Sequence, residues 1–200
     1  MLLNHVLQEM NTKPSNIILS GDSAGANLVT QVLSHISHPH PSTALPIPPI
    51  KLDAPLRGAV LISPWVDFDI TAPSFTKNER KDCIATAFGT QWSAAFLACP
   101  WPHTSASDYY NQAQTAPASW WKDLQVQEVL IVACEEEVLV DGIIKFEKKL
   151  SEGMGAGKVE ILIADGEYHD QPSLDVQLGY KAKDEGMQAK KIKTWISSKL

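Results

Sequence analysis

The sequence predicts an α/β fold in which helices flank a mostly parallel sheet of about four strands. Four short apolar runs occur in order, and each is continuous rather than alternating, which is typical of strands buried on both faces. Amphipathic helical patterns separate these runs, and alternating strands and helices are typical of a parallel sheet. With 200 residues, of which 44% are apolar, the chain is long enough for one domain with a sizeable core.

The first half of the chain contains one helix before the first strand and one after it. Apolar residues recur at helical spacing near the start, at Leu2, Leu3, Val6, Leu7 and Met10. This helix is expected to end before Pro14 and to pack on the sheet. Strands are predicted at residues 16–20 and 58–63, with a helix at 24–35. The proline-rich segment 37–55 cannot continue that helix and is expected to form an exposed surface loop.

The second half contains strands at residues 129–133 and 159–164 and helices at 139–150 and 176–200. Before these elements, residues 66–123 form a connection much longer than usual between two strands. Aromatic residues are frequent in it, and we expect a helical, cap-like insertion over the carboxyl ends of the strands. Its rings would suit an acyl group or a hydrophobic alcohol. The alternative, expected for about half of the rings, is that they pack a small core of the insertion itself.

A five-residue motif, Gly21-Asp22-Ser23-Ala24-Gly25, lies directly between the first strand and the following helix. A sharp turn there would push the Ser23 hydroxyl out of the sheet as a nucleophile. Glycines at 21 and 25 would leave room for a crowded backbone. The first turn of the helix, including the Ala24 amide, would stabilise an oxyanion. The structural alternative is a helix start at which Asp22 or Ser23 only caps free amides.

A serine nucleophile needs a base, and His169 is the candidate because it follows the last strand at the carboxyl edge of the sheet. The remaining histidines are expected to be solvated or packing residues, and they are His5, His35, His38, His40 and His103.

An acid that orients the base should follow the third strand, because nucleophile, acid and base occur in that order in this type of arrangement. Four carboxylates stand there, and spacing alone leaves open which one serves: Glu135, Glu136, Glu137 and Asp141. Asp67 and Asp69 after the second strand are a fallback. For Glu135 and Glu136 the alternative is that they only complement the dipole at a helix start.

Composition excludes several classes of function. A net charge of −6 and a pI near 5.5, with scattered basic residues, argue against nucleic-acid binding. The three cysteines, Cys83, Cys99 and Cys134, have no metal-ligand spacing and fit a reducing compartment. Neither a secretory leader nor a membrane span is expected, so we predict a cytoplasmic location. No cofactor is expected, because nucleophile, acid and base are all side chains.

Together these motifs resemble the hormone-sensitive-lipase-like group of α/β-hydrolases, especially its fungal esterases. The resemblance rests on Gly21–Asn27, Leu61–Trp65, Trp120-Trp121, Glu137–Asp141 and Gly166–His169. It implies a partial α/β-hydrolase fold and hydrolysis of a small carboxylic ester, either short-chain or hydrophobic, through an acyl-enzyme. It further implies that Ser23 is the nucleophile, Glu137 the acid and His169 the base, and that residues 66–123 include part of a cap. We predict that Asp22, Trp65 and Tyr168 contact the substrate.

The sequence also departs from that group. Members have an N-terminal portion with the first strands and a His-Gly-Gly-type oxyanion loop, whereas this sequence contains no Gly-Gly pair. We therefore expect residues 1–200 to correspond to a single C-terminal portion of such a domain. An exposed sheet edge would then favour a partner chain or self-association. The alternative function is a catalytically impaired hydrolase-like protein that binds a hydrophobic ligand or a protein partner.

Overall fold

The computed structural model describes residues 2–41, 47–97 and 108–200, so Cys99, His103 and part of the proline-rich segment lie outside the described residues. Its sheet consists of β1 (Ile18–Asp22), β2 (Gly58–Ile62), β3 (Val129–Cys134) and β4 (Val159–Ala164), in the order β1-β2-β3-β4. All three pairings are parallel. The predicted α/β fold with a four-stranded parallel sheet is confirmed.

The first strand starts two residues later than predicted. A short 3₁₀ turn, η1 (Pro14–Asn16), occupies the predicted start, and the Ile17 amide donates to the Pro14 carbonyl at 3.0 Å. Proline suits the first position of such a turn because it has no amide hydrogen to leave unpaired. The strand therefore runs up to Asp22, and Ser23 comes directly after its end.

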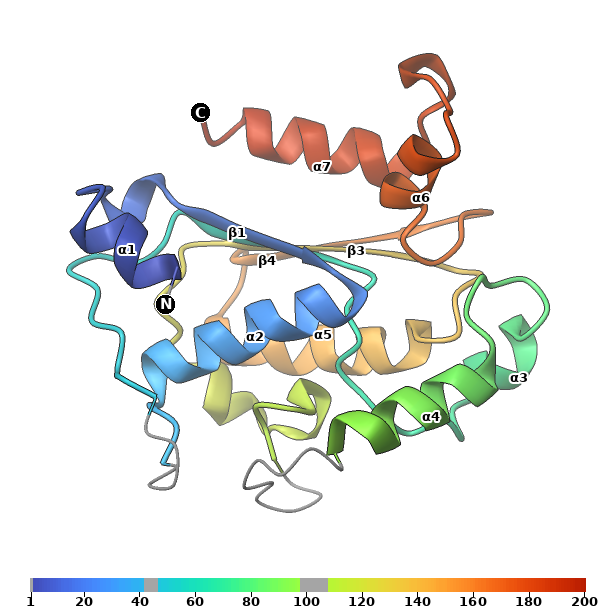
Figure 1. Cartoon of the computed structure of the whole chain (residues 1–200), viewed down its shortest axis with the longest axis horizontal. Helices are drawn as coiled ribbons and strands as arrows, with labels where there is room; N and C mark the ends of the chain where they lie inside the picture. Colours follow the sequence, from blue (N-terminus) through green and yellow to red (C-terminus); the bar gives the residue numbers. More distant parts are fainter. Residues whose placement is uncertain (1, 42–46, 98–107) are drawn as a thin grey trace.

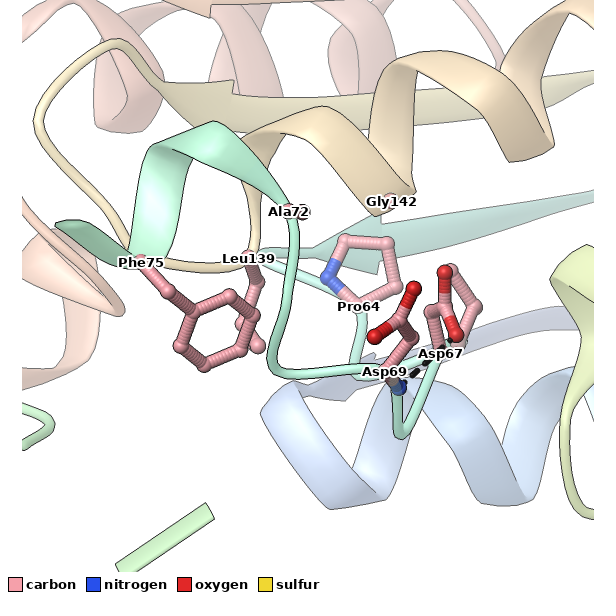
Figure 2. Close-up of a pocket in the computed structure, with 8 residues that line it drawn as sticks. Pro64, Asp67, Asp69, Ala72, Phe75, Leu139 and Gly142 are labelled. Atoms are coloured by element: carbon pink, nitrogen blue, oxygen red, sulfur yellow. Dashed lines mark hydrogen bonds between the residues drawn. The ribbon is translucent and has the colours of Figure 1, made fainter. Parts of the chain in front are cut away.

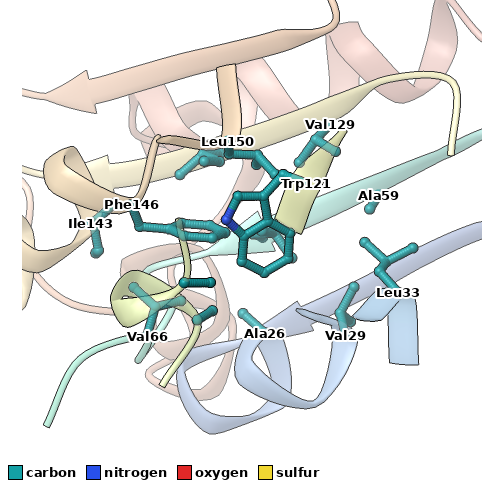
Figure 3. Packing of buried hydrophobic residues seen from close by; sticks show 14 of the residues in the cluster. Ala26, Val29, Leu33, Ala59, Val66, Trp121, Val129, Ile143, Phe146 and Leu150 are labelled. Atoms are coloured by element: carbon teal, nitrogen blue, oxygen red, sulfur yellow. The ribbon is translucent and has the colours of Figure 1, made fainter. Parts of the chain in front are cut away.

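Helices cover both faces of the sheet (Figure 1). One face is covered by α2 (Ser23–Ser37) and α5 (Val140–Met154), and the larger core lies between these helices and the strands. Trp121, Phe146 and Leu150 pack in this core (Figure 3). Leu3 and Leu7 of α1 (Leu2–Gln8) pack against the same cluster, as the helical spacing predicts. On the opposite face, Trp195 of α7 (Met187–Ser197) packs on a smaller cluster.

The single C-terminal helix predicted at residues 176–200 is wrong. The chain instead forms α6 (Gln171–Gln177), the 3₁₀ turn η4 (Ala182–Asp184) and α7. Gly179 has φ 82°, a left-handed conformation that ends a helix. Gly186 then precedes α7, whose first amides, those of Met187 and Gln188, donate to the Glu167 carboxylate. A breaking glycine and a capping partner distant in sequence thus override the helical periodicity.

The connection between β2 and β3 contains α3 (Pro73–Asn78), α4 (Thr86–Leu97) and the 3₁₀ turns η2 (Ala113–Thr115) and η3 (Ala118–Trp121). Its aromatic residues divide between two environments. Phe75 and Trp121 are buried in the main core. On α4, Phe88, Trp92 and Phe96 are exposed. The buried rings therefore serve the core of the whole domain rather than a separate core of the insertion.

In the proline-rich segment, Ser37 still belongs to α2, and the other described residues form neither helix nor strand, as predicted. The segment is not wholly a surface loop, however, because Ile50 is 4% exposed and belongs to the main core. His35 Nε2 lies 3.1 Å from the Pro48 carbonyl, which further ties the segment to α2.

Two further expectations concerned the cysteines and the lack of a membrane span. Cys83 and Cys134 are both free thiols. Within the described ranges, no helix combines the length and the apolar character needed to cross a bilayer.

Candidate active site

The carboxyl ends of the four parallel strands meet at one edge of the sheet, and the predicted site residues follow these ends. Ser23 follows β1, Ser63 and Trp65 follow β2, Glu137 follows β3, and His169 follows β4. In parallel α/β sheets this edge is where ligands bind, because loops from separate strands converge there. The fold thus places candidate nucleophile, acid and base on the same side of the molecule.

The predicted strand-to-helix turn at Ser23 is present. Asp22 ends β1 and Ser23 begins α2 with φ 48°, a left-handed conformation that is strained for a serine. A side chain at position 21 would overlap the backbone of Gly25, so Gly21 is required there. At Gly25 the prediction of crowding is wrong. An added Cβ would meet only the Asp22 Oδ1 atom at 3.6 Å, which is ordinary contact.

The structure brings Glu137 and His169 together. His169 Nδ1 lies 3.0 Å from Glu137 Oε2, and the two side chains are only 3% and 0% exposed. The Cys134 amide donates to the other Glu137 oxygen at 3.3 Å, which fixes the carboxylate. A buried anion on Nδ1 orients an imidazole and stabilises its protonated form.

The other candidate acids point elsewhere. Glu135 pairs with Lys77 at 3.1 Å and Glu136 with Lys81 at 2.8 Å, both on the surface. Asp141 accepts from the Ser74 amide at 2.9 Å.

The fallback acids also lie away from His169. Asp67 and Asp69 line a cavity of about 10 Å³ between the segment after β2 and α5, and the Asp69 amide donates to Asp67 Oδ1 at 3.0 Å (Figure 2). Such a cavity holds no more than about one water molecule. Of the six carboxylates considered from the sequence, only Glu137 contacts the imidazole.

A second carboxylate faces the opposite nitrogen of His169. Asp170 Oδ2 lies 3.2 Å from His169 Nε2. In the described parts of the chain, no hydrogen bond joins the half-buried Ser23 hydroxyl to His169. Burial lowers the pKa of His169, but hydrogen bonds to Asp170 and Glu137 and their charges outweigh it and raise the pKa to about 10. The two carboxylates therefore favour the protonated form of His169.

The other histidines that the structure describes have packing or surface roles, as expected, and His103 lies outside the described residues. His5 pairs with Glu9 at 2.9 Å on the surface. His38 Nε2 donates to the Trp120 carbonyl at 2.9 Å, and the His38 ring stacks on the Trp120 ring. His35 faces Pro48, and His40 lies against the Tyr110 ring at 4.7 Å.

The segment that carries Glu137 is held by α3, a contact that sequence reasoning missed. Asn78 Nδ2 donates to the carbonyls of Glu135 and Glu137, each at 2.9 Å. Ser74 Oγ donates to the Val138 carbonyl at 2.6 Å. These partners are more than 50 residues apart in sequence, so no local pattern could indicate the contact.

The segment that carries His169 is fastened to the C-terminal helices. Glu167 caps α7, as described above, and Tyr168 donates its hydroxyl to Asp175 Oδ1 of α6 at 3.1 Å. Burial, followed by the bond to Asp175, raises the pKa of Tyr168 to about 12. Asp22 accepts from Ser173 Oγ at 2.8 Å, which joins the Ser23 turn to α6. For Asp22 and Tyr168, substrate contact stays a prediction.

An apolar pocket of about 160 Å³ opens beside the Ser23 turn. It is lined by Ala24, Asn27, Leu28, Gln31, Trp65, Phe68 and Phe96. The Trp65 ring packs against Phe68 with centroids 4.9 Å apart. Asn27, which the sequence reasoning quoted without a role, donates to the carbonyls of Trp65 and Asn111 at 2.7 and 2.8 Å. It thereby fixes one wall of the pocket to α2.

No cluster of three or more histidine, cysteine or acidic residues suitable for a metal ion occurs in residues 2–41, 47–97 and 108–200.

Comparisons with known proteins support the α/β fold of the chain. Residues 1–172 match a family described as alpha/beta hydrolase fold. An esterase/lipase from an uncultured bacterium is 27% identical, with a TM-score of 0.65 over 86% of this chain and 50% of that chain. EstE5, soaked with p-nitrophenyl butyrate, is also 27% identical, with a TM-score of 0.65 over 86% and 51%.

A hormone-sensitive lipase from a metagenome library is 20% identical, with a TM-score of 0.73, over 99% of this chain and 59% of that chain. At that identity it supports the fold alone. The chain thus spans about half the length of the solved proteins it resembles. No curated protein sequence matches it significantly.

Proposed function

This chain belongs to the alpha/beta hydrolase fold family, and from that premise we propose that it hydrolyses carboxylic esters. In this proposal Ser23 is the nucleophile, His169 the general base and Glu137 the acid that orients it. The observation that carries the proposal is the buried contact between His169 Nδ1 and Glu137 Oε2 at 3.0 Å. A buried imidazole and carboxylate beside a strained serine turn form the arrangement that serine hydrolysis needs.

The reaction proceeds in two halves. The Ser23 oxygen attacks the ester carbonyl carbon while its proton passes to His169 Nε2, and the tetrahedral oxyanion then collapses as the alcohol leaves with that proton. Water next attacks the acyl-enzyme and gives a proton to His169, and the acid is released as this proton returns to Ser23. The Ala24 amide, in the first turn of α2, stabilises the oxyanion in both halves.

The pocket beside Ala24 suggests the class of substrate. A cavity of about 160 Å³ is close to the ~150 Å³ known to accommodate a benzene ring, so one short or ring-sized apolar group fits it. Trp65 and Phe68 supply apolar contact to that group, and Phe96 of α4 extends the wall from the cap-like region 66–123. We propose that this pocket receives one side of a small ester.

A second candidate is a hydrolase-like protein that binds a hydrophobic ligand without turning it over. It is favoured by the Asp170 carboxylate at His169 Nε2, the nitrogen that Ser23 requires. In that case the same pocket binds a small apolar ligand, and replacing Ser23 leaves the affinity unchanged.

Covalent labelling of Ser23 tests the proposal. The purified chain is treated with a fluorophosphonate probe and assayed with p-nitrophenyl acetate, beside the Ser23→Ala and Ser197→Ala variants. Ser197 is exposed at the end of α7 and serves as the matched control. We expect labelling and turnover in the wild type and in Ser197→Ala, and a loss on the order of 10³-fold or more in Ser23→Ala. A wild type that neither reacts with the probe nor hydrolyses the ester would contradict the proposal.

A further inference from the structure

We propose that Asp170 is a positioning residue that occupies Nε2 of His169 in the resting protein, so that its carboxylate must withdraw before Ser23 can transfer its proton. This inference rests on the proposed function, because it concerns how His169 becomes available to Ser23. Asp170 follows His169 directly and was not among the site residues expected from the sequence.

The geometry of the imidazole is the starting point. Glu137 Oε2 lies 3.0 Å from Nδ1 and Asp170 Oδ2 lies 3.2 Å from Nε2, so each ring nitrogen faces a carboxylate oxygen. A carboxylate oxygen can only accept a hydrogen bond. The two ring nitrogens can donate at the same time only in the imidazolium, because the neutral ring carries a hydrogen on one nitrogen alone. This arrangement therefore favours the protonated ring, in which neither nitrogen has a lone pair available for the Ser23 proton.

The backbone of Asp170 is anchored, so that only its side chain can withdraw. Its amide donates to Ser63 Oγ at 3.3 Å, and its carbonyl accepts from the amides of Ser173 and Leu174 at 2.9 and 3.0 Å. The residue has φ 54°, in the left-handed region that aspartate and asparagine tolerate better than most residues. Rotation about χ1 would move the carboxylate without disturbing these bonds.

The carboxylate is only half satisfied where it stands. Its Oδ1 atom is buried and has no hydrogen-bond partner among the described residues, although the side chain is 16% exposed. An unsatisfied buried acceptor is unfavourable, since it has lost water without a replacement. Burial, with the charges of Asp22 and Asp82, raises the pKa of Asp170, which the His169 cation partly offsets. The carboxylate of Asp170, unlike its backbone, is therefore held chiefly by the contact with His169.

The groups around this pair are acidic. Asp22 comes from the end of β1 and Asp82 from the segment after α3, and both act on Asp170. Cys83 Sγ lies 3.5 Å from the His169 carbonyl, and burial first and then Asp82 raise the pKa of this thiol to about 12, so it is uncharged. Glu137, Asp22 and Asp82, the carboxylates that act on the pair in the described part of the chain, therefore favour the imidazolium and its contact with Asp170.

Replacing Asp170 tests whether its carboxylate occupies Nε2 of His169. Asp170→Asn keeps the size and tolerates the left-handed backbone, and Asp170→Gly suits that backbone and removes the carboxylate altogether. Asp184→Asn is the charge-matched control, because Asp184 is exposed in η4 and the structure gives it no contact with His169. Circular dichroism and thermal melting establish that each variant is folded.

The deciding measurement is an NMR titration of the His169 ring, which does not depend on activity. In the wild type, the ring is expected to stay protonated well above the ordinary value of about 6.5. In Asp170→Asn and Asp170→Gly its pKa should fall by at least about one unit, because one of the two stabilising carboxylates is lost. Asp184→Asn should titrate as the wild type does. An unchanged titration in both Asp170 variants would overturn the proposal.

Probe labelling of Ser23 supplies the second measurement. Since the neutral ring is the base, labelling should rise with pH as the ring loses its proton, and this rise should move to lower pH in the Asp170 variants. At pH 7, each unit of fall in the pKa should speed labelling by up to about tenfold. Slower labelling at pH 7 in folded Asp170 variants would also overturn the proposal. A lowered ring pKa with no labelling in any variant would support the contact and count against the proposed esterase function.

Discussion

Three non-glycine residues with positive φ surround the candidate site. Ser23, Ser63 and Asp170 have φ values of 48°, 42° and 54°, and each lies beyond the carboxyl end of a strand. Such conformations cost about 1–3 kcal/mol each and persist where the surrounding structure enforces them. Ser63 and Asp170 are joined by a hydrogen bond, so the strained backbone at β2 supports the strained backbone beside His169.

At the same scale, Glu137→Gln tests the role of the acid. Glutamine keeps the shape but removes the charge that stabilises the imidazolium, and it allows the ring to adopt the wrong tautomer. We expect labelling of Ser23 to fall by about 10⁴-fold, as for the equivalent change in other triads. The rate of probe labelling at pH 8 is the measurement.

Glu136→Gln is the matched control for that variant. Its carboxylate pairs with Lys81 on the surface, and such exposed pairs contribute only about 0–1 kcal/mol. We expect its labelling rate to equal that of the wild type. Equal rates in Glu137→Gln and the wild type would count against Glu137 as the acid.

Among the elements, the short helix α3 holds the segment that carries Glu137 in place. It spans Pro73–Asn78, too short to be stable alone, yet its side chains bond the segment that carries Glu137. Part of the region predicted as a cap therefore supports the acid. In the same way, the start of α7 is bonded to Glu167, two residues before His169. Helices distant in sequence hold both partners of the buried pair.

The bond network of α3 is tested by Asn78→Ala. The substitution removes two hydrogen bonds to backbone carbonyls, of which the one to Glu137 is buried, so the free energy of unfolding should fall by roughly 1–3 kcal/mol. The loss of stability should be about 1 kcal/mol, because the substitution also removes Asn78 Oδ1, a buried acceptor without a partner among the described residues. Urea denaturation measures it.

Lys77→Ala on the same helix is the control. Lys77 makes only an exposed ion pair with Glu135, so its loss should change stability by no more than about 1 kcal/mol. If both variants unfolded at the same urea concentration, α3 would not hold the acid segment in the way the contacts indicate.

For the whole molecule, the open edge of the sheet is the notable feature. β1 lies at one end of the order β1-β2-β3-β4, and its residues are half-buried or exposed, whereas β3 is buried throughout. An unpaired apolar strand is a template for pairing with another chain. The partner chain or self-association expected from the sequence remains a prediction at this edge.

Light scattering after size-exclusion chromatography tests that prediction. We expect the apparent mass to rise with protein concentration and the rise to be reduced in Ser20→Lys, because a charge on an edge strand opposes pairing. Ser20 is exposed on β1, and Ser197→Lys places the same charge on α7 as a control. A constant monomer mass over all concentrations would contradict self-association at β1.

Much of this architecture could be predicted from the sequence because it follows from short-range patterns. Apolar runs predicted the strands, and the turn at Ser23 was predicted from five adjacent residues. Predictions from sequence patterns failed where residues distant in sequence make contacts that interrupt a local pattern. Periodicity continued the last helix through Gly179, whereas the left-handed glycine and the bond from Met187 to Glu167 interrupt it. Crowding at Gly25 was predicted because a sharp turn brings the backbone close to its neighbours, but a Cβ there would meet only Asp22 Oδ1 at 3.6 Å.

The sequence by itself determined the order of the four strands, the turn that carries Ser23, and the two segments that supply the proposed acid and base. It left four carboxylates open after the third strand and did not indicate Asp170. Only the tertiary structure decided that Glu137 meets Nδ1 and Asp170 meets Nε2. The physical reason is that sequence periodicity reports only on residues a few positions apart. His169 and Glu137 lie 32 residues apart, and they meet because the parallel strands bring their carboxyl ends to one edge of the sheet.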